Sequence, residues 1–139
     1  MRVLFDTNVI LDVLLARAPH AAPATTLLDL VSRKELDGWL GATTLTTIFY
    51  LVAKMTTPAQ ARRHVHTLLD VFEIAPVTRP VLAEALDPGF KDYEDAVLHA
   101  AARQAGATAI VTRDPGGFAS SKLRIYSPAN LLRLVEAAR

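Results

Sequence analysis

Short apolar runs alternate with longer stretches of helical periodicity along this chain. Residues 2–5 and 109–112 are almost wholly apolar and end at polar or turn residues, which is typical of buried strands. The same pattern predicts shorter strands at 39–40, 72–77 and 123–126. Between them, apolar residues at helical spacing predict helices over 9–15, 21–34, 48–54, 79–86 and 92–105. Two further helices are predicted to begin at Pro58 and at Pro128. The first of these has an apolar stripe of Val65, Leu68, Leu69 and Phe72. Strands separated by helices favour a parallel sheet covered on both faces.

Composition narrows the class of protein. The 139 residues are 51% hydrophobic and 21% charged, which predicts one globular domain over 1–139 and excludes a disordered chain. Fifteen basic residues against 14 acidic ones give a net charge of +1, so there is no large positive charge to indicate a nucleic-acid-binding protein. The absence of cysteine excludes disulfides and thiolate metal sites and fits a reducing cytoplasm. Asp6 and Asp12 interrupt the first apolar stretch, so we expect neither a signal peptide nor a membrane-spanning helix there.

Aspartates follow the two strongest strands and open the helix between them. Asp6 follows the first strand, Asp114 follows the strand at 109–112, and Asp92 and Asp95 lie three residues apart at a helix start. Singly, each has a structural interpretation, as a helix cap or as part of an Asp-Pro-Gly turn. Together, carboxylates at the carboxyl ends of parallel strands repel one another unless a cation is bound. Oxygen ligands suit Mg²⁺ or Mn²⁺, and such a site fits hydrolysis of a phosphodiester.

Three segments, at residues 6–12 (DTNVILD), 92–96 (DYEDA) and 112–114 (TRD), resemble the signature segments of the PIN-domain family, and most closely those of VapC-like ribonuclease toxins. The resemblance implies a three-layer α/β/α sandwich with a mostly parallel sheet. It also implies a cytoplasmic, Mg²⁺-dependent endoribonuclease (a hydrolase) that forms a homodimer and is inhibited by a cognate antitoxin. By position, Asp6 and Asp95 would be the principal metal ligands and Asp114 a further acidic residue. Asn8 would hydrogen-bond within the site, and the Thr112 hydroxyl would orient a carboxylate or a phosphate.

One position departs from the family pattern. Many members carry a glutamate early in the third helix, where this chain has Thr47. The threonine run around it could equally be a capped helix start without chemistry. We expect Asp92, one helical turn before Asp95, to supply the missing carboxylate.

Further residues keep two interpretations each. Arg113 could bind an RNA phosphate or form a salt bridge, and His99, four residues after Asp95, is expected at a structural or rim position. After residue 100 there are six basic residues (Arg103, Arg113, Lys122, Arg124, Arg133 and Arg139) and two acidic ones (Asp114 and Glu136), so the excess is 6 − 2 = +4. This region could receive RNA or an acidic partner, or be a solvated face. Leu14, Leu27 and Leu51 could line a partner groove or belong to the core.

Other functions fit less well. A nucleotide-binding domain is disfavoured because no glycine-rich phosphate motif follows a predicted strand. A phospho-acceptor domain would carry a lysine after a late strand, where this chain has Arg113 and Asp114. The serious alternative to an endoribonuclease is a catalytically weakened PIN-like module that binds RNA or protein, because Thr47 lacks a charge.

Overall fold

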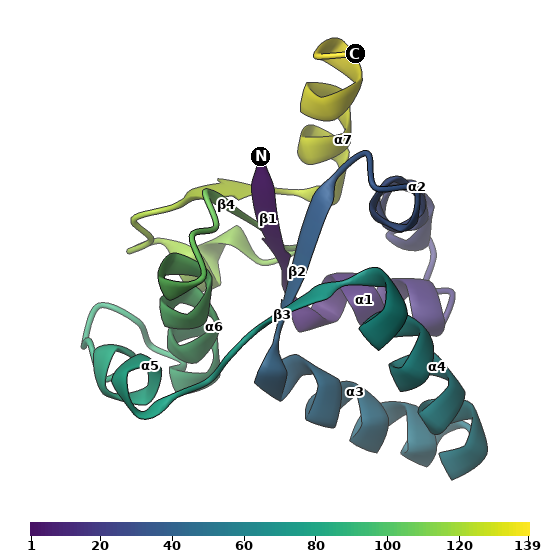
Figure 1. Cartoon of the computed structure of the whole chain (residues 1–139), viewed down its shortest axis with the longest axis horizontal. Helices are drawn as coiled ribbons and strands as arrows, with labels where there is room; N and C mark the ends of the chain where they lie inside the picture. Colours follow the sequence, from purple (N-terminus) through teal and green to yellow (C-terminus); the bar gives the residue numbers. More distant parts are fainter.

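The computed structural model describes residues 1–139, and its centre is a five-stranded sheet in the order β3-β2-β1-β4-β5 (Figure 1). Every strand pair is parallel. The strands are β1 (Arg2–Phe5), β2 (Asp37–Gly41), β3 (Glu73–Ala75), β4 (Ala109–Val111) and β5 (Arg124–Tyr126). The helices are α1 (Thr7–Leu14), α2 (Ala21–Ser32), α3 (Ala42–Met55), α4 (Pro58–Val71), α5 (Arg79–Glu84), α6 (Tyr93–Gln104), the 3₁₀ turn η1 (Pro115–Phe118) and α7 (Pro128–Ala137). No helix is both long and apolar enough to cross a bilayer.

The sheet separates two hydrophobic cores, because successive side chains of a strand point to opposite faces. Val3 and Phe5 of β1 join the core that α1, α2, α3 and α4 cover, whereas Leu4 joins the core beneath α5 and α6. Figure 1 shows α5 and α6 on one side of the sheet and α1 to α4 on the other. The three-layer α/β/α sandwich expected from the resemblance is therefore confirmed, and the sheet is wholly parallel.

The strand order reverses at the centre of the sheet, and we call the region outside the carboxyl ends of β1 and β4 the crevice. From β1 the chain moves outward through β2 to β3 and then returns, so that β4 pairs with the other side of β1. Phe5 of β1 and Val111 of β4 are partners in register, so both strands end at the same level. In open α/β sheets, ligand sites form where the strand order reverses in this way.

Three details of the sequence interpretation are wrong. The predicted helix at 48–54 begins at Ala42, because the threonine run is itself helical and Thr44 packs inward, with its hydroxyl 2.8 Å from that of Thr7. Leu69 is 51% exposed and does not belong to the apolar stripe of α4. The strand expected over 72–77 is only Glu73–Ala75, because Phe72 ends α4 and packs edge-on against Phe5.

The three leucines left open in the sequence divide between core and rim. Leu27 is fully buried in the larger core. Leu14 and Leu51 are half-buried and pack against it.

Candidate active site at the carboxyl ends of β1 and β4

Asp6 is held rigidly where β1 ends. It is the N-cap of α1, and its Oδ1 accepts a hydrogen bond from the Thr7 N–H at 2.7 Å. Its Oδ2 accepts a hydrogen bond from the Thr112 hydroxyl at 2.7 Å, which joins the ends of β1 and β4. Burial raises the pKa of Asp6, and nearby Asp114 and Glu94 raise it further, whereas the two hydrogen bonds act in the opposite direction. Asp6 is thus both a helix cap and a buried acid of the site.

Asp95 has the most perturbed carboxyl group. It lies in the first turn of α6, and its pKa is raised to about 7, first by burial and then by the charges of Asp6, Asp92, Asp114 and Glu94. A carboxyl group with that pKa is about half protonated at neutral pH. Asp95 therefore lies in the common field of the other acids, as the sequence predicted.

Asp92 and Asp114 combine a structural position with proximity to Asp95. Asp92 is the N-cap of α6, where its Oδ1 accepts the Asp95 N–H at 3.1 Å. Asp114 precedes η1 without capping it, and its N–H donates to the Thr112 hydroxyl oxygen at 3.0 Å. Thr112 thus accepts from the Asp114 backbone and donates to Asp6, which fits its predicted orienting role.

Gly117 of η1 permits the close approach of two of these carboxylates. A Cβ atom built at Gly117 would lie 2.6 Å from Asp95 Oδ2 and 3.3 Å from Asp114 Oδ2. Any side chain there would displace one carboxylate or both. The sequence analysis gave Gly117 no role, because the signal is spatial.

Glu94 is a second omission. The Thr47 hydroxyl, in the second turn of α3, donates to Glu94 Oε1 at 3.4 Å. Glu94 therefore brings a carboxylate to the position where Thr47 lacks one. The sequence analysis gave Glu94 no role of its own, although its place beside Asp95 in the DYEDA segment was a usable signal.

Asn8 and Arg113 join the loop after β4 to α1. Asn8 Oδ1 accepts the Arg113 N–H at 3.4 Å, so the expected hydrogen-bonding role of Asn8 is directed at the backbone. The Arg113 Nε donates to Asp12 Oδ2. A salt bridge is therefore present, and the sequence interpretation did not foresee that its partner would be the buried Asp12.

His99 is structural, as expected. It is buried in α6, its Nε2 accepts the Lys122 N–H at 3.1 Å, and its ring packs 4.8 Å from that of Phe90. Burial lowers its pKa, and the charge of Arg103 acts in the same direction.

The comparisons with known proteins agree with this architecture. A model of the PIN domain matches residues 2–115. The chain belongs to the PIN-domain family. A search of curated proteins found no significant relative. PIN-domain toxins such as VapC are nucleases, and members of this family generally use a divalent metal.

Solved structures of toxin–antitoxin proteins resemble this PIN domain over most of its length. FitAcB from Neisseria gonorrhoeae is 25% identical, with a TM-score of 0.68, over 91% of this chain and 98% of that one. VapBC2 from Rickettsia felis, solved with a fragment of promoter DNA, is 16% identical with a TM-score of 0.71 over 91% and 98%. VapC20 from Mycobacterium tuberculosis, described as a toxin that cleaves the sarcin-ricin loop, is 16% identical with a TM-score of 0.62 over 78% and 86%. The last two likenesses concern the fold alone.

The donor set of this PIN domain fits a hard divalent cation. None of the five carboxylates around the crevice has a Lys, Arg or His nitrogen within salt-bridge distance; they belong to Asp6, Asp92, Glu94, Asp95 and Asp114. No three His, Cys, Asp or Glu side chains are close enough to ligate one ion directly. Mg²⁺ commonly binds through one or two carboxylates and keeps several waters, so an unpaired, all-oxygen cluster of this kind is compatible with it.

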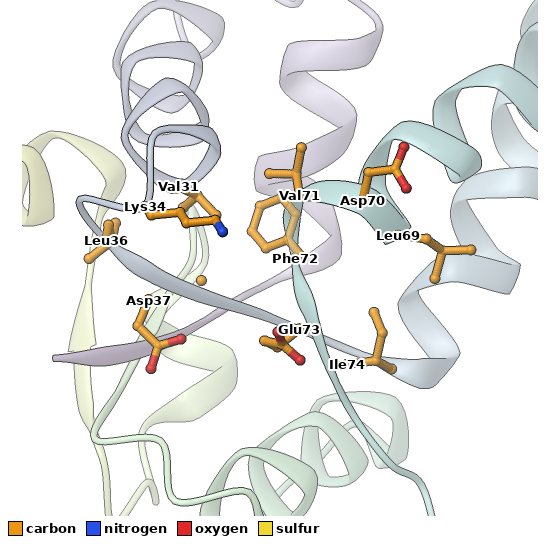
Figure 2. A pocket seen from close by; sticks show the side chains of 11 residues that line it. Val31, Lys34, Leu36, Asp37, Leu69, Asp70, Val71, Phe72, Glu73 and Ile74 are labelled. Atoms are coloured by element: carbon orange, nitrogen blue, oxygen red, sulfur yellow. The ribbon is translucent and has the colours of Figure 1, made fainter.

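A pocket of about 690 Å³ lies away from these carboxylates (Figure 2). It opens beside the amino-terminal part of β2 and next to β3, with Val31, Phe72 and Ile74 among its apolar residues. None of the residues assigned to the crevice lines it. Because ligands of such sheets bind at the carboxyl ends of the strands, the crevice and not this pocket is the candidate active site.

Proposed function

We propose that this PIN domain is a divalent-metal-dependent endoribonuclease that hydrolyses RNA phosphodiester bonds. The observation that carries the proposal is a set of five carboxylates that have no basic partner. Burial, together with the charges of the other four, raises the pKa of Asp95 to about 7. Like charges gathered without counter-charge cost free energy unless a cation is bound. Such a cluster at the ligand-binding edge of an α/β sheet is expected to serve a reaction that needs the cation.

Asp6 and Asp95 are the proposed principal ligands of Mg²⁺ or Mn²⁺, with Asp114 close to Asp95 through Gly117. When bound, such an ion stabilises negative charge on a phosphate and favours the ionisation of water. Thr112 keeps Asp6 in place through its hydroxyl. Asp92 and Glu94 are the two candidates for the acidic group absent at Thr47, and the contact with Thr47 favours Glu94.

We further propose that the protein is the toxin of a toxin–antitoxin pair that acts in the cytoplasm as a homodimer. The likeness to FitAcB, at 25% identity over most of both chains, supports this biological role. Expression without the cognate antitoxin should then arrest growth, and Asp95→Asn should abolish the arrest. Co-expression of the neighbouring antitoxin gene should restore growth of cells that carry the unmodified protein.

The enzymatic proposal is tested with purified protein, freed of antitoxin, and a mixture of labelled RNAs. We expect cleavage with Mg²⁺ or Mn²⁺ and none with EDTA. Asp6→Asn and Asp95→Asn should each lower the rate at least about 100-fold, because each removes a proposed ligand charge. Asp70→Asn, which removes an exposed carboxylate of α4, is the matched control and should cleave like the unmodified protein.

The absence of a carboxylate at Thr47 favours one alternative, a PIN domain that binds RNA or protein without cutting it. Failure to cleave any RNA with either metal, in protein shown to bind RNA, would support that alternative and contradict the enzymatic proposal.

A further inference from the structure

Asp12 is a buried charge in the middle of α1, and the reaction proposed above does not use it. Its side chain is 1% exposed. A buried carboxylate is costly unless it is paired, and two arginines approach it. The Arg113 Nε donates to Asp12 Oδ2, whereas the Arg17 Nε lies 3.2 Å from Oδ1 without the angles of a hydrogen bond. The carboxylate is therefore committed mainly to Arg113.

Arg113 has donors to spare. A guanidinium group carries five N–H donors, and only that of Nε has a partner in the protein. The two terminal nitrogens, Nη1 and Nη2, make no hydrogen bond, and the side chain is 29% exposed. Arg113 also lines an open pocket of about 250 Å³ together with His20 and Ser127. The fork is thus fixed on its inner edge and free on its outer edge.

The position of Arg113 in the chain places it next to residues of the carboxylate site. Its neighbours in the chain are Asp114 and Thr112, and the Thr112 hydroxyl donates a hydrogen bond to Asp6. Its own N–H donates to Asn8, so backbone and side chain are both tied to α1. The five unpaired carboxylates nearby repel an RNA backbone in the absence of a metal ion. The Arg113 guanidinium group, held beside these carboxylates, would offset that repulsion and determine where a phosphate binds.

We propose that Asp12 is a positioning residue, which holds Arg113 by its Nε so that the two terminal nitrogens bind an RNA phosphate beside the carboxylate site. This inference rests on the proposed ribonuclease function, because it takes RNA as the ligand. The positioning role and a plain salt bridge predict opposite changes in RNA affinity when the Asp12 charge is removed. A purely electrostatic account predicts that removing the Asp12 charge strengthens RNA binding, whereas positioning predicts that it weakens binding.

The test is equilibrium binding of a fluorescein-labelled oligouridine, followed by anisotropy in EDTA over a series of KCl concentrations. Arg113→Gln should raise the Kd about tenfold and reduce the salt dependence by about 0.7 in log–log slope, the value for one phosphate contact on a single strand. Asp12→Asn should raise the Kd about threefold although the protein becomes more positive. The double variant should bind the RNA with the same Kd as Arg113→Gln alone, because both substitutions act on one contact.

Two further variants complete the series. Arg113→Lys keeps the charge, but its single nitrogen cannot both pair with Asp12 and offer a phosphate the two separate donor nitrogens of an arginine. Its Kd should therefore rise with little change in the slope of the salt dependence. Glu84→Gln is the matched control: Glu84 pairs with Arg103 through the same kind of Nε hydrogen bond, away from the crevice. Its Kd should stay within about twofold of the unmodified protein. Urea unfolding identifies any variant that fails to fold, in which case the Arg113 variants decide.

The outcomes separate this inference from the ribonuclease proposal. If Arg113→Gln leaves the slope unchanged, or if Asp12→Asn tightens binding, the positioning role is overturned whether or not the protein cleaves RNA. If unmodified protein shows no salt-dependent binding, the inference is also overturned. Binding that follows the expected pattern in a protein that cuts no RNA supports the positioning role and contradicts the enzymatic proposal alone.

Discussion

At the scale of single residues, Gly117 should affect the reaction although it has no side chain. Gly117→Ala places a Cβ 2.6 Å from Asp95 Oδ2, closer than such atoms approach, so the carboxylate must move. We expect the rate of RNA cleavage to fall at least about tenfold, since small displacements of catalytic groups are costly. The thermal midpoint should change little, because Gly117 lies outside both hydrophobic cores.

Gly116→Ala is the control for that prediction. A Cβ at Gly116 lies 3.5 Å from Asp114 Oδ1, an ordinary contact, so this variant should retain activity. Equal rates for the two alanine variants would show that the close approach at Gly117 does not matter to the reaction.

At the scale of elements, the start of α6 has two functions that substitutions can separate. Asp92 caps the helix and also adds negative charge beside Asp95. Asp92→Asn keeps a good cap and removes the charge, so it should weaken Mn²⁺ binding several-fold while stability stays within about 0.5 kcal/mol. Asp92→Ala should add a loss of stability of about 1 kcal/mol. Calorimetric titration with Mn²⁺ and urea unfolding give the two readouts.

Glu94→Gln on the same helix tests which acid replaces the one absent at Thr47. If Mn²⁺ affinity is unchanged in Asp92→Asn but reduced in Glu94→Gln, the carboxylate comes from Glu94, as its contact with Thr47 favours. Unchanged affinity in Asp92→Asn contradicts the expectation formed from the sequence.

At the scale of the whole molecule, the crevice should make the metal-free fold sensitive to pH. The folded-state pKa of Asp95 is raised to about 7, and that of Asp6 is raised as well, so the folded protein holds these protons more tightly than the unfolded chain. The resulting stabilisation is complete below about pH 4 and is lost as the pH rises through about 7. In EDTA, the free energy of unfolding should therefore fall over this interval.

Asp95→Asn isolates the effect of this residue. Because Asp95 is only half-buried, its charge is partly screened by solvent. We therefore expect the stability of the variant, relative to that of the unmodified protein, to rise by about 1–2 kcal/mol between pH 5 and pH 8. Urea unfolding at the two pH values measures it. Mg²⁺ at pH 8 should stabilise the unmodified protein and leave the variant unaffected. Parallel pH profiles for the two proteins would contradict the assignment.

The charge of the molecule also has to be read in three dimensions. The excess of +4 after residue 100 was compatible with a region that receives RNA or an acidic partner and with a solvated face. In the structure, three of the six basic residues pair with acids from earlier in the chain. Arg103 pairs with Glu84, Arg113 with Asp12 and Arg139 with Glu35. The near balance of total charge therefore conceals an acidic crevice and a C-terminal region in which half of the basic residues are paired with acids.

Local pattern determined much of the fold. The apolar run of Val3, Leu4 and Phe5 predicted a buried strand. In the structure Val3 and Phe5 enter one core and Leu4 the other, because a strand's side chains point alternately to its two faces. Strand ends followed by Asp6 and Asp114 located the ligand edge, since parallel strands place their carboxyl ends together. The start of α3 was missed because threonines favour strands and caps, and here packing against α1 keeps them helical.

The sequence by itself determined the layered α/β architecture, the family and the aspartates at the strand ends, because these depend on periodicity and on short motifs. Only the tertiary structure decided which groups meet. It brought Glu94 to Thr47, set Gly117 against Asp95 and buried Asp12 beneath Arg113. Each of these contacts joins elements that are far apart in the chain and that only folding brings together, so no local pattern could have shown them.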